Sequence, residues 1–401
     1  MALWQRWQGV QRALRRARLA APPAGEALLH DEGAAHAAER AARQQAAEVA
    51  RELGAAPGGG MEVFDRALKR AHRDRAAALR GAAGGADPLL ASVSDRLLDR
   101  LEDCVAKFPT AVVLGGAGEY IAERLAGGRG GIERVIHIDS SPGMIELAKA
   151  RRAALMSSDP SKPWPEVSYV LADEEALPLA PGSVDVIISC LGLHWANDLP
   201  GAMAQCRLAL RPDGLFLAAM FGGDTLQELR IACAVAQQER QGGVSPFVSP
   251  LAQVRDAGNL LTRASLALPT VDVDNFSINY ATPFDLVAHL RSMGEGAALA
   301  ARRRGALTRG LAVAAAAAYG GLFPGEGGEG VAATYQVMYM TGWSPDKSQP
   351  RPAKRGSANI TFEEFAAQLE SHGAAGPAGA AAAAAAGGGA GERGPEGSGA
   401  V

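Results

Sequence analysis

The central part of the chain alternates short apolar runs with stretches of helical periodicity. The apolar runs predict strands at residues 111–114, 135–138, 167–171, 184–189 and 215–220, and two later strands at 271–278 and 335–340. Runs with few polar residues suit strands that are buried on both faces, and the helical stretches between them indicate parallel crossovers. The pattern therefore predicts an α/β fold with a mostly parallel, seven-stranded sheet and helices on both faces.

Helical spacing of apolar residues predicts further helices on either side of these strands, at residues 88–104, 283–293 and 299–319. Regular patterning begins at residue 61. We therefore expect one domain over residues 61–372, in which N-terminal helices lead into the sheet.

Both ends of the chain have a different composition. Residues 1–25 contain five arginines and no acidic residue, with apolar residues on one helical face, which is typical of an organelle transit peptide. A solvated basic helix is the alternative. Residues 26–60 resemble a low-complexity linker, and the Ala/Gly-rich residues 373–401 predict a disordered tail.

Composition excludes several classes of protein. A 48% hydrophobic content excludes a wholly disordered chain, and a net charge of −3 argues against a polybasic nucleic-acid surface. The four cysteines form no C-x-x-C pair, which argues against a disulfide framework and a structural zinc site. No apolar run approaches the roughly 20 residues that a transmembrane helix needs.

Candidate binding residues follow the first three predicted strands. Gly115, Gly116 and Gly118 form a glycine-rich turn after the first strand, where a cofactor could approach the backbone; a simple tight turn is the alternative. Asp139 ends the second strand, where a carboxylate can accept ribose hydroxyls or take part in capping the next helix. Asp173 follows the third strand and could contact an adenine amino group.

The loop after the fourth strand carries His194 and Trp195 near the same edge of the predicted sheet. A histidine there could take part in proton transfer, whereas packing is the alternative for both rings. The histidines are scattered along the chain, and none belongs to a recognisable iron-binding triad of two histidines and a carboxylate. The motifs identify no metal ligands, no oxidant and no catalytic residues.

In this order and at these strand ends, the motifs of residues 110–220 resemble the class I S-adenosylmethionine-dependent methyltransferases. The resemblance implies a Rossmann-like, seven-stranded fold and S-adenosylmethionine as cofactor. It also implies a set of cofactor-binding residues: Gly115, Gly116, Gly118, Asp139, Met144 and Asp173.

Further segments are not general to methyltransferases. Phe64-Asp65-Arg66 and residues 220–230, 239–246, 250–261, 333–343 and 355–358 resemble the mitochondrial assembly factors of respiratory complex I that act as protein arginine hydroxylases. This resemblance covers residues 61–372. It implies that the protein acts in the mitochondrial matrix, where peripheral association with the inner membrane is the alternative to a freely diffusing protein. It also implies a target arginine in the iron–sulfur subunit beside the quinone site.

The first turn departs from the usual methyltransferase pattern. Val113 replaces an acidic residue, Ala117 replaces a glycine, and Glu119 stands where the last glycine is expected. The Glu119 carboxylate would repel the carboxylate of the cofactor. Three hypotheses therefore stay open: an arginine hydroxylase, a methyltransferase acting on a small molecule or a protein, and a non-catalytic assembly chaperone with a vestigial cofactor site.

Overall fold

A computed structural model describes residues 62–84, 86–302, 308–350 and 364 of the 401-residue chain. Contacts divide the chain into one unit over Met1–Ser348 and another over Gln349–Val401, and every helix and strand named below lies in the first unit. The predicted transit peptide, linker and tail lie outside the described residues, as does the motif at 355–358.

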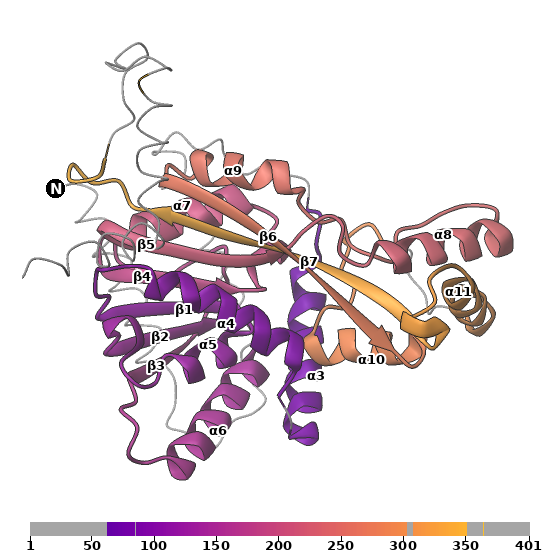
Figure 1. Cartoon of the computed structure of the whole chain (residues 1–401), viewed down its shortest axis with the longest axis horizontal. Coiled ribbons are helices and arrows are strands. Elements are labelled where there is room, and N and C mark those ends of the chain that lie inside the picture. The colour runs from indigo at the N-terminus through magenta and orange to yellow at the C-terminus, as the bar shows by residue number, and fades with distance from the viewer. Residues whose placement is uncertain (1–61, 85, 303–307, 351–363, 365–401) are drawn as a thin grey trace, which may run out of the picture. The chain divides into compact units, whose positions relative to one another are not determined.

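The first unit is built on a single seven-stranded sheet with the order β3-β2-β1-β4-β5-β7-β6 (Figure 1). Strands β1 to β5 run parallel, whereas β7 runs antiparallel to both β5 and β6. All seven predicted strands are present, so the predicted class I methyltransferase fold is confirmed. The strands are β1 (Thr110–Gly116), β2 (Arg134–Asp139), β3 (Glu166–Leu171), β4 (Val184–Cys190), β5 (Leu210–Phe221), β6 (Ala267–Tyr280) and β7 (Val331–Trp343).

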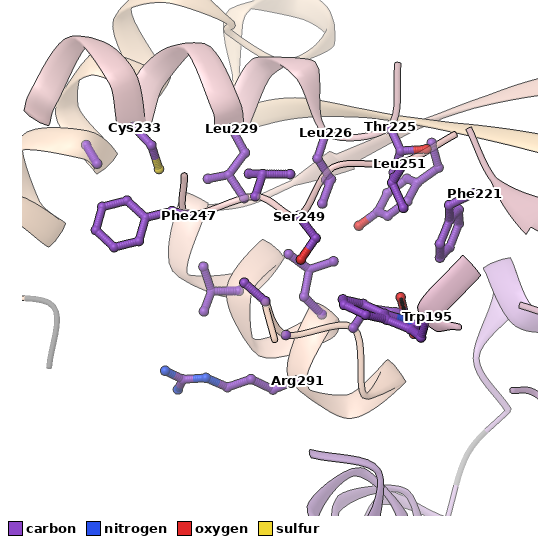
Figure 2. Close-up of a pocket in the computed structure, with 18 of the residues that line it drawn as sticks. Trp195, Phe221, Thr225, Leu226, Leu229, Cys233, Phe247, Ser249, Leu251 and Arg291 are labelled. Carbon is purple, nitrogen blue, oxygen red and sulfur yellow. Dashed lines mark hydrogen bonds between the residues drawn. The ribbon is translucent and has the colours of Figure 1, made fainter. Parts of the chain in front are cut away.

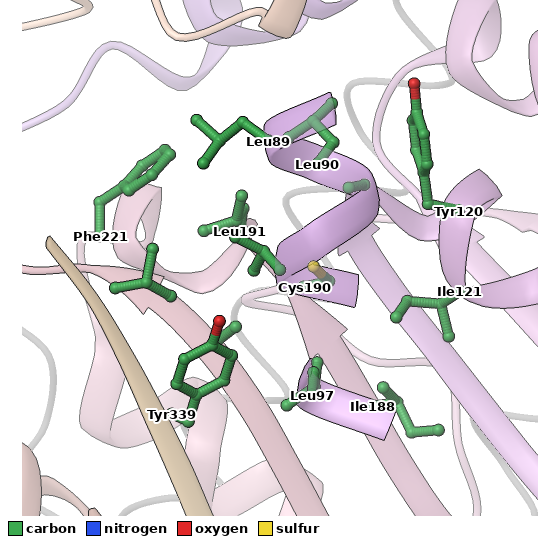
Figure 3. Close-up of a cluster of buried hydrophobic side chains, with 14 of the residues drawn as sticks. Leu89, Leu90, Leu97, Tyr120, Ile121, Ile188, Cys190, Leu191, Phe221 and Tyr339 are labelled. Atoms are coloured by element: carbon green, nitrogen blue, oxygen red, sulfur yellow. The ribbon is translucent and has the colours of Figure 1, made fainter. Parts of the chain in front are cut away.

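Successive residues of the central strands point to opposite faces of the sheet and belong to two separate hydrophobic cores. In β1, Val112 and Leu114 pack with α7 (Leu199–Ala209) and α9 (Val254–Arg263) on one face. Ala111 and Val113 contribute to the other face, where α4 (Pro88–Glu102) and α5 (Gly118–Arg124) pack. Figure 3 shows part of this second core, with leucines of α4 against Cys190 and Tyr339. Strands covered on both faces explain the near-continuous apolar runs of the sequence.

Three helices gather where β6 and β7 extend beyond the parallel strands (Figure 1). They are α8 (Gln227–Gln241), α10 (Pro283–Met293) and α11 (Arg309–Leu322). The helix predicted at 299–319 therefore begins later than expected. Leu299 instead forms a β-bridge with Phe64, which holds the backbone there extended.

The remaining elements complete the connections between strands. They are α3 (Arg66–Ala83), α6 (Pro142–Ser158) and the short helices η1 (Arg129–Gly131), η2 (Leu193–Trp195) and η3 (Glu326–Gly328). Within the described ranges, no helix combines the length and apolar character that crossing a membrane requires.

Candidate functional site

The turn between β1 and α5 requires glycine at position 116. Its φ is +60°, and a Cβ atom there would overlap the carbonyl oxygen of Cys190 in the neighbouring strand β4. Only glycine combines this left-handed backbone with so close an approach. Gly116 thus fixes where β1 ends and leaves its own carbonyl at the sheet edge.

The other two predicted glycines have different surroundings. A Cβ on Gly118 would come within 2.5 Å of the His137 ring, so this glycine allows α5 to pack closely on β2. A Cβ on Gly115 would meet the carboxylate of Glu174 at 2.5 Å. The space beside Gly115, where a cofactor was expected to approach, therefore holds the Glu174 side chain in this structure.

Helix α3 lies across the carboxyl ends of the parallel strands and delivers Arg73 to the predicted ribose site (Figure 1). The Arg73 guanidinium pairs with the Asp139 carboxylate and donates to the Gly116 carbonyl at 3.1 Å. Both charged side chains are at least 95% buried. Burial raises the pKa of Asp139 to about 6, while the neighbouring Arg73 acts in the opposite direction.

Two more arginines of α3 pair with acids of this edge. Arg66 contacts Asp173 at 2.8 Å and also pairs with Glu174. Arg80 pairs with Glu119, the acid that replaces the last glycine of the turn. The predicted repulsion between Glu119 and a cofactor carboxylate is therefore offset, because the charge of Glu119 is already partnered by Arg80.

The segment before α3 is anchored on the loop after β4. The Asn197 side chain accepts from the backbone of Val63 and Phe64 at 2.9 and 2.8 Å and donates to the Phe64 carbonyl. The Phe64 ring packs edge-on against Trp195, and Asp65 caps the first turn of α3. The Phe64-Asp65-Arg66 motif thus positions the basic face of α3 over the strand ends.

The structure brings all six predicted cofactor residues to one edge of the sheet. Met144, at the start of α6, packs beneath Ala76 and Ala77 of α3. The sequence predicted N-terminal helices, but it did not show that α3, the first of them, reaches this site. A signal was present, because its basic residues Arg66, Lys69, Arg73 and Arg80 recur at spacings of three, four and seven and so share one helical face.

A second cluster of buried polar groups lies next to the first. The Glu295 carboxylate contacts the His194 ring at 3.0 Å, the Trp195 indole N–H at 2.9 Å and the Lys69 ammonium at 3.2 Å. Lys69 also lies 3.3 Å from the Trp195 ring centroid and donates to the Gly294 carbonyl. His194 and Trp195 are thus packed against neighbouring rings and also bonded to Glu295, so the packing role predicted as one alternative is present for both.

The end of α10 fixes the position of Glu295. Gly294 has a φ of +80°, its N–H donates to the Arg291 carbonyl, and the N–H of Glu295 donates to the Leu290 carbonyl at 2.8 Å. This pair of bonds is the Schellman motif, which favours glycine at the left-handed position. Lys69 and its neighbours lower the pKa of Glu295 to about 2, against the effect of burial, so the side chain stays ionised.

An apolar cavity of about 230 Å³ opens beside this second cluster (Figure 2). Residues of α8, α10 and α11 line it together with Trp195 and Glu295. The sequence did not predict this cavity, although parts of its walls belong to the motif segments 220–230, 250–261 and 333–343, because these segments meet only in the tertiary structure. Among the residues that the structure describes, no group of three or more His, Cys, Asp or Glu side chains is arranged to hold a metal ion.

Acid should destabilise the protein through His137, which is 1% exposed and packs beside Gly118. Burial lowers its pKa from 6.5 to about 4. Below pH 6.5 the unfolded chain gains a proton that the folded chain takes up only near pH 4, so stability present above pH 6.5 is lost as the pH falls. The loss should be on the order of 2–3 kcal/mol.

Urea unfolding at pH 7 and pH 4.5 would measure this loss. We expect His137→Gln to show a smaller difference between the two pH values than the unsubstituted protein. An equal difference in both proteins would assign the acid sensitivity to other groups.

The comparison with protein families agrees with this geometry. A family model described as "Methyltransferase domain" matches residues 113–218, from the middle of β1 into β5. The sheet order and the matched domain define a protein of the methyltransferase fold class.

Individual relatives define the family more narrowly. The chain is 40% identical over 307 residues to the mitochondrial arginine-hydroxylase NDUFAF5 of Danio rerio, covering 77% of this chain and 90% of that protein. The human protein of the same name is 42% identical over 305 residues, covering 76% and 84%. The chain belongs to this family, whose members are named as mitochondrial proteins. A malonyl-[acyl-carrier protein] O-methyltransferase of Xylella fastidiosa is 34% identical over 253 residues, covering 63% and 80%.

Proposed function

We propose that this protein is a mitochondrial assembly factor of respiratory complex I that hydroxylates an arginine of the iron–sulfur subunit near the quinone site. Hydroxylation replaces a C–H bond with a C–OH bond, a two-electron oxidation, so an oxygen donor such as dioxygen with a two-electron reductant must enter as co-substrate. The observation that carries the proposal is the identity of about 40%, over three quarters of the chain, to arginine-hydroxylases. The basic residues 1–25 support the mitochondrial matrix as the place of action, with peripheral association with the inner membrane.

We further propose that the strand ends bind S-adenosylmethionine. The residue types fit this cofactor: Asp139 would accept the ribose hydroxyls, Asp173 the adenine amino group, and the turn at Gly115 and Gly116 would face the rest of the cofactor. When bound, the cofactor supplies a transferable methyl group on a sulfonium. Arg73 now pairs with Asp139, Arg66 pairs with Asp173, and Glu174 fills the space beside Gly115, so binding would require Arg73, Arg66 and Glu174 to move.

Two other functions have a specific observation in their favour. Methyl transfer to a small molecule or protein is favoured by the methyltransferase domain and by the likeness to an O-methyltransferase. A chaperone with a vestigial cofactor site is favoured by the pairing of the strand-end acids with α3.

Deleting the gene and examining complex I tests the three alternatives. We expect deletion to lower the amount of assembled complex I and to remove one added oxygen from an arginine of the iron–sulfur subunit, as read by mass spectrometry. Loss of a methyl group would support methyl transfer. Loss of assembly with no change in mass would support the chaperone.

A further inference from the structure

The cavity between α8, α10 and α11 has the size of a side-chain pocket. Its volume of about 230 Å³ lies below the range of about 300–1,000 Å³ that is usual for small-molecule sites. Its walls are apolar and aromatic along most of their extent, including Phe247, Leu229 and Leu290. Such walls suit the aliphatic stem of a long side chain.

One end of the cavity is built to hold a positive charge. Trp195 and Glu295 both line it, and they combine an aromatic face with an ionised carboxylate. This pair already holds a cation, the ammonium of Lys69, which lies 3.3 Å from the ring centroid of Trp195. Lys69 itself does not line the cavity. Trp195 and Glu295 therefore contact Lys69 and also form part of the cavity wall.

A buried hydroxyl in the cavity wall indicates that the cavity binds a group that donates hydrogen bonds. Ser249 is 6% exposed, and its Oγ atom has no hydrogen-bond partner in the structure. Figure 2 shows this oxygen pointing into the space that faces Trp195. A buried hydroxyl without a partner is costly, so a donor from a bound guest would satisfy it.

The only other charged residue among those lining the described cavity is Arg291. Its side chain is exposed, and its guanidinium extends away from Trp195 in Figure 2. The negative charge of Glu295 thus lies beside Trp195, and the positive charge of Arg291 points away from Trp195. A guest should place a cation at Glu295 and carbonyl or carboxylate oxygens toward Arg291.

We propose that this cavity binds the side chain of the substrate arginine, with the guanidinium donating to Glu295 and Ser249 and stacking on Trp195. An arginine has the required aliphatic stem, and its planar head suits both a carboxylate and an aromatic face. This inference rests on the proposed function, since that function makes a protein-bound arginine the substrate. Glu295 and Trp195 are then substrate-binding residues.

Lys69 can lose its positive charge when the guanidinium of a substrate arginine binds to Glu295. Lys69 is buried beside Arg66 and Arg73, and burial together with these arginines lowers its pKa to about 7, while Glu295 acts in the opposite direction. An incoming guanidinium at Glu295 would lower this pKa further, so Lys69 would release a proton. Binding of arginine should therefore be accompanied by proton release near pH 7.

Calorimetric titration with N-acetyl-arginine amide and N-acetyl-citrulline amide tests the inference. Citrulline has nearly the shape of arginine but no charge. Because a hydrogen bond to a charged group contributes roughly 1.5–3 kcal/mol, we expect arginine to bind about 10–100-fold more tightly than citrulline. In Glu295→Gln this preference should shrink to about twofold. Equal binding of the two compounds by the unsubstituted protein would overturn the inference, as would a full preference in Glu295→Gln.

A second variant tests the cavity without touching the Glu295 cluster. Ala315 of α11 lines the cavity, whereas Ala317 of the same helix is exposed and does not. We expect Ala315→Phe to weaken binding of both compounds at least tenfold, because the ring fills the space, and Ala317→Phe to bind like the unsubstituted protein. Unchanged binding in Ala315→Phe would place the arginine site elsewhere.

The outcomes also separate this inference from the proposed function. If the subunit arginine gains oxygen in cells while binding is insensitive to Glu295→Gln and Ala315→Phe, the pocket assignment is wrong and the hydroxylase function stands. If binding depends on both residues while the subunit arginine gains no oxygen, the pocket stands and the hydroxylase function is wrong.

Discussion

Replacing Asp139 with alanine should lower the free energy of unfolding by about 3–5 kcal/mol, because it removes the carboxylate that Arg73 contacts and leaves the guanidinium buried. Arg73 is only 4% exposed, so water cannot replace the lost partner without rearrangement. Urea unfolding at pH 7 would measure the loss. A double variant in which Arg73→Met accompanies Asp139→Ala should recover more than half of it, since no unpaired charge remains.

Asp95→Ala is the matched control. Asp95 also pairs with an arginine, Arg124, but its side chain is 54% exposed, so its loss should cost less than about 1 kcal/mol. If Asp139→Ala costs no more than Asp95→Ala, the buried pair does not hold α3 on the sheet.

Replacing Arg73 with methionine should tighten S-adenosylmethionine binding by about 10–100-fold. In the present conformation the cofactor must displace Arg73 from Asp139, and breaking a charged hydrogen bond costs roughly 1.5–3 kcal/mol. The methionine leaves the carboxylate available to the ribose hydroxyls and keeps much of the apolar volume of the stem. Loss of Arg73 also raises the pKa of the buried Asp139 carboxyl group, so calorimetric titration at pH 8.5, where more of the carboxylate form remains, would measure the change.

Arg96→Met serves as the control for this substitution. Arg96 pairs with Asp274, both side chains are at least one-third exposed, and neither belongs to the strand-end site. Its affinity for the cofactor should equal that of the unsubstituted protein. Weaker binding in Arg73→Met would show that Arg73 holds the cofactor instead of competing with it.

The sheet could be predicted from the sequence because each parallel strand is an apolar run that ends at a distinct residue. Asp139 and Asp173 follow two such runs, and the ends of parallel strands meet at one edge, so their proximity followed from the pattern alone. Gly116 was singled out as part of a turn. Its close approach to Cys190 depends on the neighbouring strand and was not predictable from the local sequence.

The ion pairs that α3 forms with the strand-end acids could not be predicted in the same way. Arg73 and Asp139 are 66 residues apart in the sequence. They meet because the contact between Phe64 and Asn197 fixes where α3 docks on the sheet. Glu295 carries no motif, because its position depends on how α10 ends at Gly294. Local patterns predict which residues end an element, whereas partners across elements depend on tertiary packing.

We propose that this protein adds oxygen, and not a methyl group, to an arginine of complex I. The most direct test is mass spectrometry of the iron–sulfur subunit from cells fed methionine with a deuterated methyl group. We expect one arginine-containing peptide to gain a single oxygen and no deuterium, and this gain to disappear when the gene is deleted. A deuterated methyl group on that peptide, present only with the gene, would contradict the hydroxylase function and establish methyl transfer.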